Sequence, residues 1–274
     1  LIAPHILTMT ATPIPRTVAL TAYGDLDLST LAELPSGRKK TKTWVVPENR
    51  RPAAHKWIKQ LVKNERAQAF IICPLIDESV IESMQQVKAA TAEFATLKKV
   101  FAGLKLGLLH GRLSASEKQD VITRFRLGEL DILVSTPVVE VGVDIPNATL
   151  MVIETAHRFG LASLHQLRGR VGRGEKQSYC LLFTQNRGGV SARRLAAMEK
   201  SLSGFELAEI DLTMRGPGEL VGIKQHGFSD LKIANWADKN LIVESLQVAQ
   251  KVQHKPMLFK KTLKLLHLAN IAMN

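Results

Sequence analysis

Short apolar runs alternate with helical patterns over the first two-thirds of the chain, and this alternation restricts the fold more than any other feature. The expected strands are rich in Val, Ile and Leu and show little alternation with polar residues, which is typical of strands covered on both faces. They are Ile6–Thr10, Thr43–Pro47, Ala69–Pro74, Leu104–His110, Asp131–Ser135, Thr149–Glu154 and Ser178–Thr184. Helices are expected at Pro52–Arg66, Val80–Phe101, Ser114–Leu127 and Leu161–Arg168. This order predicts an α/β fold in which helices flank a doubly wound parallel sheet.

The helix expected at Ser114–Leu127 has the clearest boundaries. Ser114 and Glu117 have the spacing of a capping box, in which each side chain satisfies a backbone N–H of the first turn. Gly128 follows the helix and is expected to end it.

Changes of pattern divide the chain into four parts. Residues 1–24 begin inside a strand pattern without an initiator Met, so we expect the chain to be a fragment of a longer protein. Residues 25–42 contain Pro, Gly and a basic run, which indicates a linker, and residues 43–190 contain the alternating strands and helices. Residues 191–274 are expected to be helical, with a hairpin (Ser191–Leu202 and Phe205–Met214), a Gly-rich loop and a helical tail.

Composition and charge limit the kinds of partner and cellular setting that fit this chain, but they do not identify its function. The net charge is +12 and the pI is near 9.8, which favours a polyanionic partner, although an inert basic surface is an equal alternative on charge alone. No apolar run approaches the ~18 residues of a membrane span. Cys73 and Cys180 lie in apolar runs and are expected to be buried thiols in a reducing, cytoplasmic setting.

Histidines and tryptophans give no further site. The eight histidines show no metal-ligand spacing, so no metal site is expected. His5, His110, His157 and His165 are expected to be satisfied loop or helix residues rather than ligands. Trp44, Trp57 and Trp236 are not expected to cluster in a base-stacking row.

The most informative segment runs from Gln166 to Gly174 and places three arginines among three glycines. Glycines let the backbone approach a ligand closely, and arginines offer rigid forked donors that match phosphate oxygens. An arginine at the transferring phosphate can raise the rate by ~10³–10⁵. The alternative is a solvated basic turn, but the whole run, placed after a strand and a helix, favours a triphosphate.

Two other segments end buried strands in hydroxyl-bearing residues. Ser135 and Thr136 stand where ligands gather in open α/β sheets, and they could hold a nucleic-acid phosphate or merely form an ordinary turn. Asp144, which follows Gly142, could accept from a ribose hydroxyl or satisfy local N–H groups. Thr12 precedes Pro13 and is also consistent with a simple helix cap.

These three segments occur in a fixed order that resembles superfamily-two helicases. Thr10-Ala11-Thr12 is similar to their motif III, Ser135–Asp144 to motif V, and Gln166–Arg173 to motif VI. Within that superfamily the closer resemblance is to the RecG family of branched-DNA helicases. It rests on Tyr23–Asp27, Glu33–Arg38, Ile72–Ile76, Leu109–Ser114, Gly204–Glu206, Arg215–Leu220 and Gln225. The resemblance implies the end of a first RecA-like domain, a second RecA-like motor domain, and a hairpin that couples nucleotide state to movement.

The resemblance also implies roles for single residues. Arg170, Arg173 and Gln166 are expected to sense a triphosphate bound on the preceding domain, with Gly142 and Asp144 near the same nucleotide. The residues implied for DNA contact and coupling are Thr10, Thr12, His110, Gly111, Ser135, Thr136, Arg194, Arg215 and Gln225. The implied cofactors are ATP and Mg²⁺. The implied partners are double-stranded and branched DNA and the upstream domains of the same polypeptide, in a monomeric cytoplasmic motor with no membrane contact.

The sequence also departs from the family in places. Lys224 stands where the family usually has Arg, which loses a forked donor, and Pro137 replaces a usual Thr. No phosphate loop and no strand ending in an Asp-Glu pair for Mg²⁺ occurs in this sequence. We therefore expect an ATP-dependent DNA helicase of which this chain alone hydrolyses no ATP. Two alternatives are the motor of a transcription-repair coupling factor and a non-catalytic basic module with the same fold.

Overall fold

The computed structural model describes residues 39–74, 82–137, 145–186, 188–215 and 239–265, together with Leu7, Met9 and Ser29. Some features expected from the sequence lie outside these residues, namely the strand Ile6–Thr10, most of the linker 25–42, Lys224, and the site residues Thr10, Thr12, Gly142, Asp144 and Gln225. The backbone of Arg215 is described at the end of a helix, but its side chain is not.

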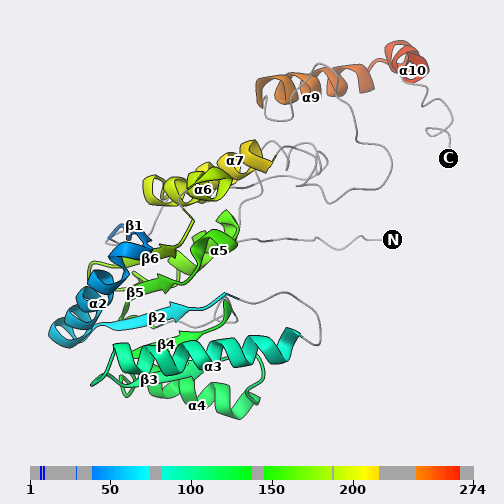
Figure 1. Cartoon of the computed structure of the whole chain (residues 1–274). Helices are drawn as coiled ribbons and strands as arrows, with labels where there is room; N and C mark the ends of the chain where they lie inside the picture. Colours follow the sequence, from blue (N-terminus) through cyan, green and yellow to red (C-terminus); the bar gives the residue numbers. More distant parts are fainter. Residues whose placement is uncertain are drawn as a thin grey trace. The chain divides into compact units, whose positions relative to one another are not determined.

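Six parallel strands form one sheet in the order β1-β6-β5-β2-β4-β3 (Figure 1). They are β1 (Lys42–Pro47), β2 (Gln68–Ile72), β3 (Leu106–Leu109), β4 (Ile132–Ser135), β5 (Ala148–Ile153) and β6 (Tyr179–Thr184). The central strands β2, β4 and β5 are buried along their whole length, which explains why their sequences do not alternate. The α/β prediction is confirmed.

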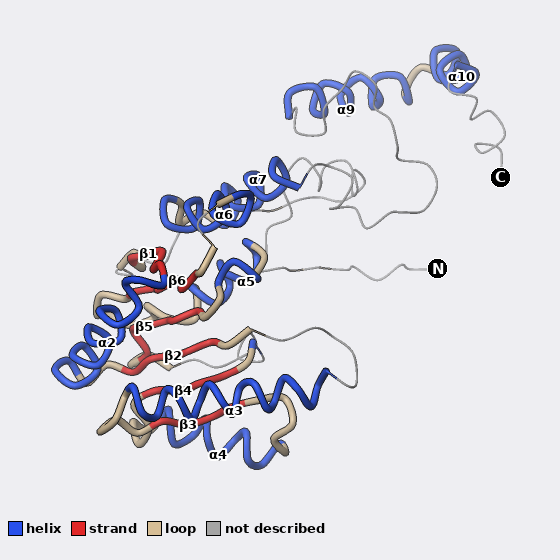
Figure 2. The backbone as a smooth tube through the Cα atoms, in the orientation of Figure 1, coloured by secondary structure: helices blue, strands red, loops and turns tan. Residues whose placement is uncertain are grey.

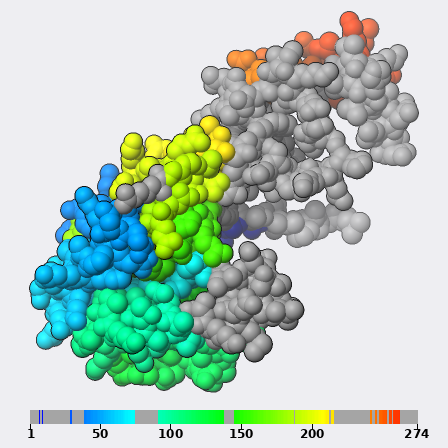
Figure 3. All heavy atoms as spheres, viewed as in Figure 1, coloured from blue at the N-terminus to red at the C-terminus, as the bar shows by residue number. Residues whose placement is uncertain are grey.

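Helices cover both faces of this sheet (Figure 2). They are α2 (Arg51–Glu65), α3 (Glu82–Val100), α4 (Ala115–Arg126), α5 (Leu161–Arg168), α6 (Gly189–Lys200) and α7 (Gly204–Arg215), with short 3₁₀ turns η1 (Glu48–Arg50) and η3 (Ala156–Arg158). Successive strand residues point to opposite faces. Phe70 and Ile72 pack in the core formed with α4, α5 and α6, whereas Ala69 and Ile71 pack in the core formed with α2 and α3. In the space-filling view α2 (blue) and the described part of α3 (green-cyan) lie next to each other on one face (Figure 3).

Helix α4 begins and ends where the sequence predicted. The hydroxyl of Ser114 accepts from the backbone N–H of Glu117 at 3.2 Å, and the Glu117 carboxylate accepts from the N–H of Ser114 at 2.8 Å. The predicted capping box is therefore confirmed. Gly128 follows the helix with φ of +78°, a conformation that suits glycine at a helix end.

Strand β1 lies at one edge of the sheet and is protected there. The backbone N–H of Val45 donates to the Glu199 carboxylate of α6 at 3.0 Å. Pro47 ends the strand with a residue that has no N–H to offer. Unpaired edge strands are templates for unwanted pairing, so α6 and Pro47 together close this edge.

Three aromatic rings cluster beside α2. Trp44 stacks on Tyr179 with ring centroids 5.4 Å apart, and Trp57 meets these two rings edge-on at 5.6 and 5.1 Å. Trp44 and Trp57 thus lie side by side, but they meet edge-on and do not form a row of parallel rings on which bases could stack. The pairing of β1 with β6, which no local pattern shows, brings these rings together.

The described elements fall into two compact units. One contains the sheet, α2 to α6 and most of α7. The other contains α9 (Lys239–Gln253) and α10 (Pro256–Leu265), which contact each other. Among the helices that the structure describes, none has the length and apolarity to cross a lipid bilayer.

Candidate functional site

The arginine-rich segment begins on α5 and continues into a turn over residues 169–174, which we call the arginine turn. Gln166 lies in the last part of α5 and is half-buried, as is Arg170 just beyond the helix. Arg173 is exposed. The three residues expected to sense a nucleotide therefore lie in and just after the C-terminal end of one short helix, and none of them is fully buried.

Glycines of the arginine turn make close contacts that a side chain would block. Gly172 has φ of +77°, and a Cβ atom there would lie 3.1 Å from the Thr41 hydroxyl and 3.2 Å from the Ser178 hydroxyl. A Cβ atom on Gly174 would lie 3.2 Å from the carbonyl oxygen of Pro146. Because Thr41, Pro146 and Ser178 come just before β1, β5 and β6, the turn is fixed at the amino ends of these three strands.

Arg168, the last residue of α5, is buried, with 4% of its surface exposed. Its guanidinium donates to the carbonyl oxygens of Met198 and Ser201 at 2.8 Å each and to that of Leu202 at 3.4 Å. It also contacts Nδ1 of His165 at 3.1 Å. Carbonyl oxygens at the end of a helix lack partners within the helix and attract cations. Arg168 therefore clamps the end of α6 to α5; we call this set of contacts the Arg168 clamp.

No separate role was predicted for Arg168, although its position in the sequence indicates that it is buried. The buried stripe of α5 contains Leu161 and Leu164, and Arg168 falls on the same face, where a charged residue needs a specific partner. Burial lowers the pKa of this guanidinium. Burial, and to a lesser degree the charge of Arg168, lower the pKa of His165 to about 4. Neutral His165 can then accept a hydrogen bond from Arg168, so the expectation of a satisfied histidine is confirmed at this position.

Helices α6 and α7 form the two consecutive helices predicted after the sheet. Leu195 and Met198 of α6 and Leu207 of α7 belong to the same core as α5. Nε of Arg194 lies 3.7 Å from a carboxylate oxygen of Asp211, so an ion pair joins the two helices. Arg194, predicted as a polar coupling contact, thus lies between α6 and α7.

A second group of predicted residues lies at the opposite ends of the strands, where β3 and β4 finish. Ser135 and Thr136 are buried, and the Ser135 hydroxyl donates to the carbonyl oxygen of Thr136 at 2.6 Å. The N–H of Thr136 donates to the carbonyl oxygen of Leu109 at 3.3 Å, which places Thr136 beside His110. Within the described part of the chain, the Thr136 hydroxyl and Nδ1 of His110 have no hydrogen-bond partner. Gly111 is exposed next to them.

Ser135 and Thr136, which the sequence predicted to act alike, differ in their hydrogen bonding. The hydroxyl of Ser135 is already used within the turn, whereas the buried hydroxyl of Thr136 has no hydrogen-bond partner among the described residues. The described residues offer no hydrogen-bond partner to Nδ1 of His110, so the expectation that this histidine is satisfied is not confirmed there. Buried polar groups without a partner are costly, so they are typical of positions where a ligand completes the hydrogen bonds.

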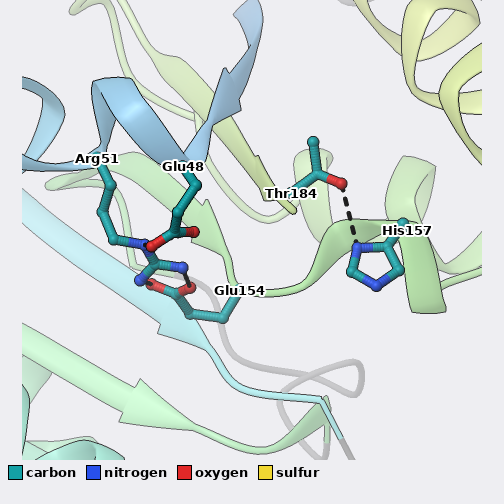
Figure 4. A network of polar contacts seen from close by, with 5 residues as sticks. All are labelled: Glu48, Arg51, Glu154, His157 and Thr184. Atoms are coloured by element: carbon teal, nitrogen blue, oxygen red, sulfur yellow. Dashed lines mark hydrogen bonds and ion pairs between the residues drawn. The ribbon is translucent and has the colours of Figure 1, made fainter. Parts of the chain in front are cut away.

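A third polar group, which sequence reasoning missed, lies at the carboxyl ends of β1, β5 and β6 (Figure 4). Glu154 follows β5, and its carboxylate accepts two hydrogen bonds from the Arg51 guanidinium, at 3.1 and 2.7 Å. Nε of Arg51 also contacts Glu48 at 3.2 Å. Burial raises the pKa of the Glu154 carboxyl group, and the neighbouring Arg51 offsets part of that rise. An acidic residue that directly follows a fully buried strand was the signal in the sequence.

Two more residues complete this group. Nδ1 of His157, in η3, lies 3.1 Å from the hydroxyl of Thr184 at the end of β6. The same hydroxyl exchanges hydrogen bonds of 3.1 Å with the backbone of Asn186. His157 is therefore satisfied, as the sequence analysis expected.

Two family models match this chain. The model of the helicase conserved C-terminal domain matches residues 53–175, and that of the C-terminal part of domain 3 of the ATP-dependent DNA helicase RecG matches residues 201–268. The chain is 49% identical over 250 residues to the ATP-dependent DNA helicase RecG of Synechocystis sp.. That alignment covers 90% of this chain. This chain belongs to the RecG family.

Other RecG proteins give the same result. The RecG of Haemophilus influenzae is 49% identical over 245 residues, which is 89% of this chain. A solved structure described as RecG bound to a three-way DNA junction superposes with a TM-score of 0.66 at 46% identity and covers 86% of this chain. The chain spans only 30% and 35% of the two RecG relatives and 30% of the solved chain. The fold and the family are thus shown for this segment, and the expected RecA-like architecture is confirmed.

Proposed function

We propose that this chain is the second motor unit, with the following coupling helices, of an ATP-driven translocase that remodels branched DNA. The observation that carries the proposal is the arginine turn. Forked donors of Arg170 and Arg173 lie on a glycine-spaced backbone at one end of α5, and Arg168 fixes the same end to α6. The RecG relatives are named ATP-dependent DNA helicases, and the similar solved structure is bound to a three-way DNA junction.

The residues present suit a nucleoside triphosphate held mainly by another part of the polypeptide. Exposed Arg173 and half-buried Arg170 offer planar donors to phosphate oxygens, and Gln166 adds an amide beside them. Gly142 and Asp144 precede Pro146, which contacts the arginine turn, and we assign them to the ribose side. ATP with Mg²⁺ supplies the phosphoryl group whose hydrolysis drives movement. Because this sequence has no phosphate loop, we assign the grip on ATP to an upstream domain.

We assign DNA contact to the carboxyl ends of β3 and β4. The unpartnered Thr136 hydroxyl and His110 ring nitrogen can each donate to a backbone phosphate oxygen, and the exposed backbone of Gly111 lets the phosphate approach. Ser135 supports this site by fixing Thr136 rather than by direct contact. Thr10 and Thr12 are proposed to join DNA handling to hydrolysis.

Coupling is assigned to the helices after the sheet. Arg194 holds α6 to α7 through Asp211, and α6 is held to α5 by the Arg168 clamp. A change at the arginine turn can therefore reach α7 through packed helices. Arg215 and Gln225 are proposed as the polar contacts beyond α7.

The test is Arg173→Ala in the full-length protein, with Arg126→Ala on the exposed face of α4 as the matched control. We expect Arg173→Ala to abolish DNA-stimulated ATP hydrolysis while DNA binding stays largely intact, because the guanidinium acts on the nucleotide. Arg126→Ala should retain both activities. Equal loss of hydrolysis and DNA binding in Arg173→Ala would contradict the assigned role.

DNA affinity gives an independent check. Contacts to backbone phosphates release counterions, so affinity for a branched duplex should fall steeply with salt. A flat salt response would remove the phosphate-contact assignment. We further propose that the motor acts as a cytoplasmic monomer. The curated relatives described above are RecG proteins, which favours branched DNA over a stalled transcription complex as its target.

A further inference from the structure

The ion pair between Arg51 and Glu154 ties together three strands. In the sheet β6 lies between β1 and β5, so a contact from the start of α2 to the end of β5 must pass over the end of β6. The Arg51 guanidinium does this while lying 4.8 Å from the centroid of the Phe183 ring in β6. The Glu154 side chain is only 7% exposed, so it is too enclosed to serve as a surface contact for a polyanion.

The residue after Glu154 has a disfavoured backbone. Thr155 has φ of +46° and ψ of +45°, the left-handed conformation that β-branched residues rarely adopt. Such a conformation persists only where the surroundings hold it. Here Glu154 is held on one side by Arg51, and His157 is held on the other by Thr184, as Figure 4 shows.

This turn leads through the short helix η3 into α5. Gly160 precedes the helix, and α5 has only eight residues, so its start and its end are close in space. Its buried Leu164 and Leu167 interlock with neighbouring side chains, so α5 responds as one rigid unit rather than by bending. A change of backbone direction at Thr155 is therefore transmitted to Gln166 and Arg170 at the far end.

We propose that the Arg51–Glu154 ion pair is a positioning element for the arginine turn: it holds the Thr155 backbone in its left-handed conformation and so sets where α5 presents Arg170. This inference rests on the proposed function. Glu154 and Arg51 do not touch the nucleotide. They act through the direction of α5, and their removal changes the turnover rate rather than DNA affinity.

The experiment uses the full-length protein and three variants. Glu154→Gln removes the two-oxygen acceptor of Arg51 while keeping the size of the side chain. Glu154→Gln combined with Thr155→Asn places at the turn a residue that tolerates the left-handed conformation without support. Glu129→Gln is the matched control, because Glu129 forms an exposed ion pair with Arg124 on α4 at 3.4 Å.

ATP hydrolysis is measured as a function of the concentration of a branched DNA, which separates kcat from the apparent DNA affinity. A 1 Å misplacement of a catalytic group can cost about 100-fold, so we expect kcat of Glu154→Gln to fall by about 10- to 100-fold. DNA affinity should not weaken. The double variant should regain most of the lost kcat, and Glu129→Gln should match the wild type.

Different outcomes test the proposed function and the positioning role of the ion pair. Absence of DNA-stimulated hydrolysis in the wild type refutes the proposed function itself. Wild-type hydrolysis with an unchanged kcat in Glu154→Gln refutes only the positioning role, as does a folded double variant that shows no recovery. If Glu154→Gln alone does not fold, the double variant decides: wild-type-like kcat supports the proposal, and low kcat in a folded protein overturns it.

Discussion

The Arg168 clamp gives the sharpest stability prediction. Arg168→Ala removes a charged donor from two carbonyl oxygens at 2.8 Å and one at 3.4 Å. A hydrogen bond from a charged group contributes about 1.5–3 kcal/mol, so the two short bonds give roughly 3–6 kcal/mol. Desolvation of the buried guanidinium, which also lowers its pKa, offsets part of this sum. We therefore expect the free energy of unfolding to fall by about 3 kcal/mol, a large share of the ~5–15 kcal/mol typical of a domain.

The assay is urea denaturation of the chain followed by far-ultraviolet circular dichroism. The stability of Arg168→Lys should lie between those of the wild type and Arg168→Ala, because a lysine keeps the charge but loses the second nitrogen of the guanidinium, Nη2, which contacts Leu202 and His165. Arg124→Ala is the matched control, since this exposed arginine pairs with Asp120 and Glu129 on the surface, and it should change stability by less than about 1 kcal/mol. A loss below about 1 kcal/mol in Arg168→Ala would refute the clamp.

Three further predictions concern the same unit. Gly172→Ala should destabilise the chain by roughly 1–2 kcal/mol in thermal melts, and by more than Gly128→Ala, because both have positive φ but only Gly172 is crowded by neighbouring atoms. Since the folded-state pKa of His165 lies near 4, below its ordinary value of 6.5, its contribution to stability is complete above pH 6.5 and is lost as the pH falls towards 4. The loss should be on the order of 1 kcal/mol after allowance for its partial exposure, and His165→Asn should flatten the melting temperature over that range. Thr136→Val should leave the stability unchanged or slightly higher, because the hydroxyl has no partner in the described part of the chain. In the full-length protein the same substitution should weaken the binding of branched DNA in a fluorescence anisotropy titration. Undiminished binding would exclude a phosphate contact at Thr136.

Local patterns determined much of this protein. Apolar runs without alternation predicted strands covered on both faces, and all such strands within the described residues are present. Ser114, Glu117 and Gly128 predicted both ends of α4, because a helix cap depends on residues within a few positions of one another. The arginine turn was predicted as well, since its spacing of Gly and Arg is itself local. Its fixation by Thr41, Ser178 and Pro146 was not.

What the sequence left open depends on the order of the strands. Arg51 and Glu154 are 103 positions apart in the sequence. They meet because the order of the sheet places β1 and β5 only one strand apart, on either side of β6. Arg168 reaches carbonyl oxygens 30 to 34 positions away, at the end of a helix that could have packed elsewhere. No periodicity encodes such partners. Helix caps and strand patterns follow from backbone geometry within one element, whereas a buried charge finds its partner only after the packing of the whole sheet has fixed which ends lie side by side.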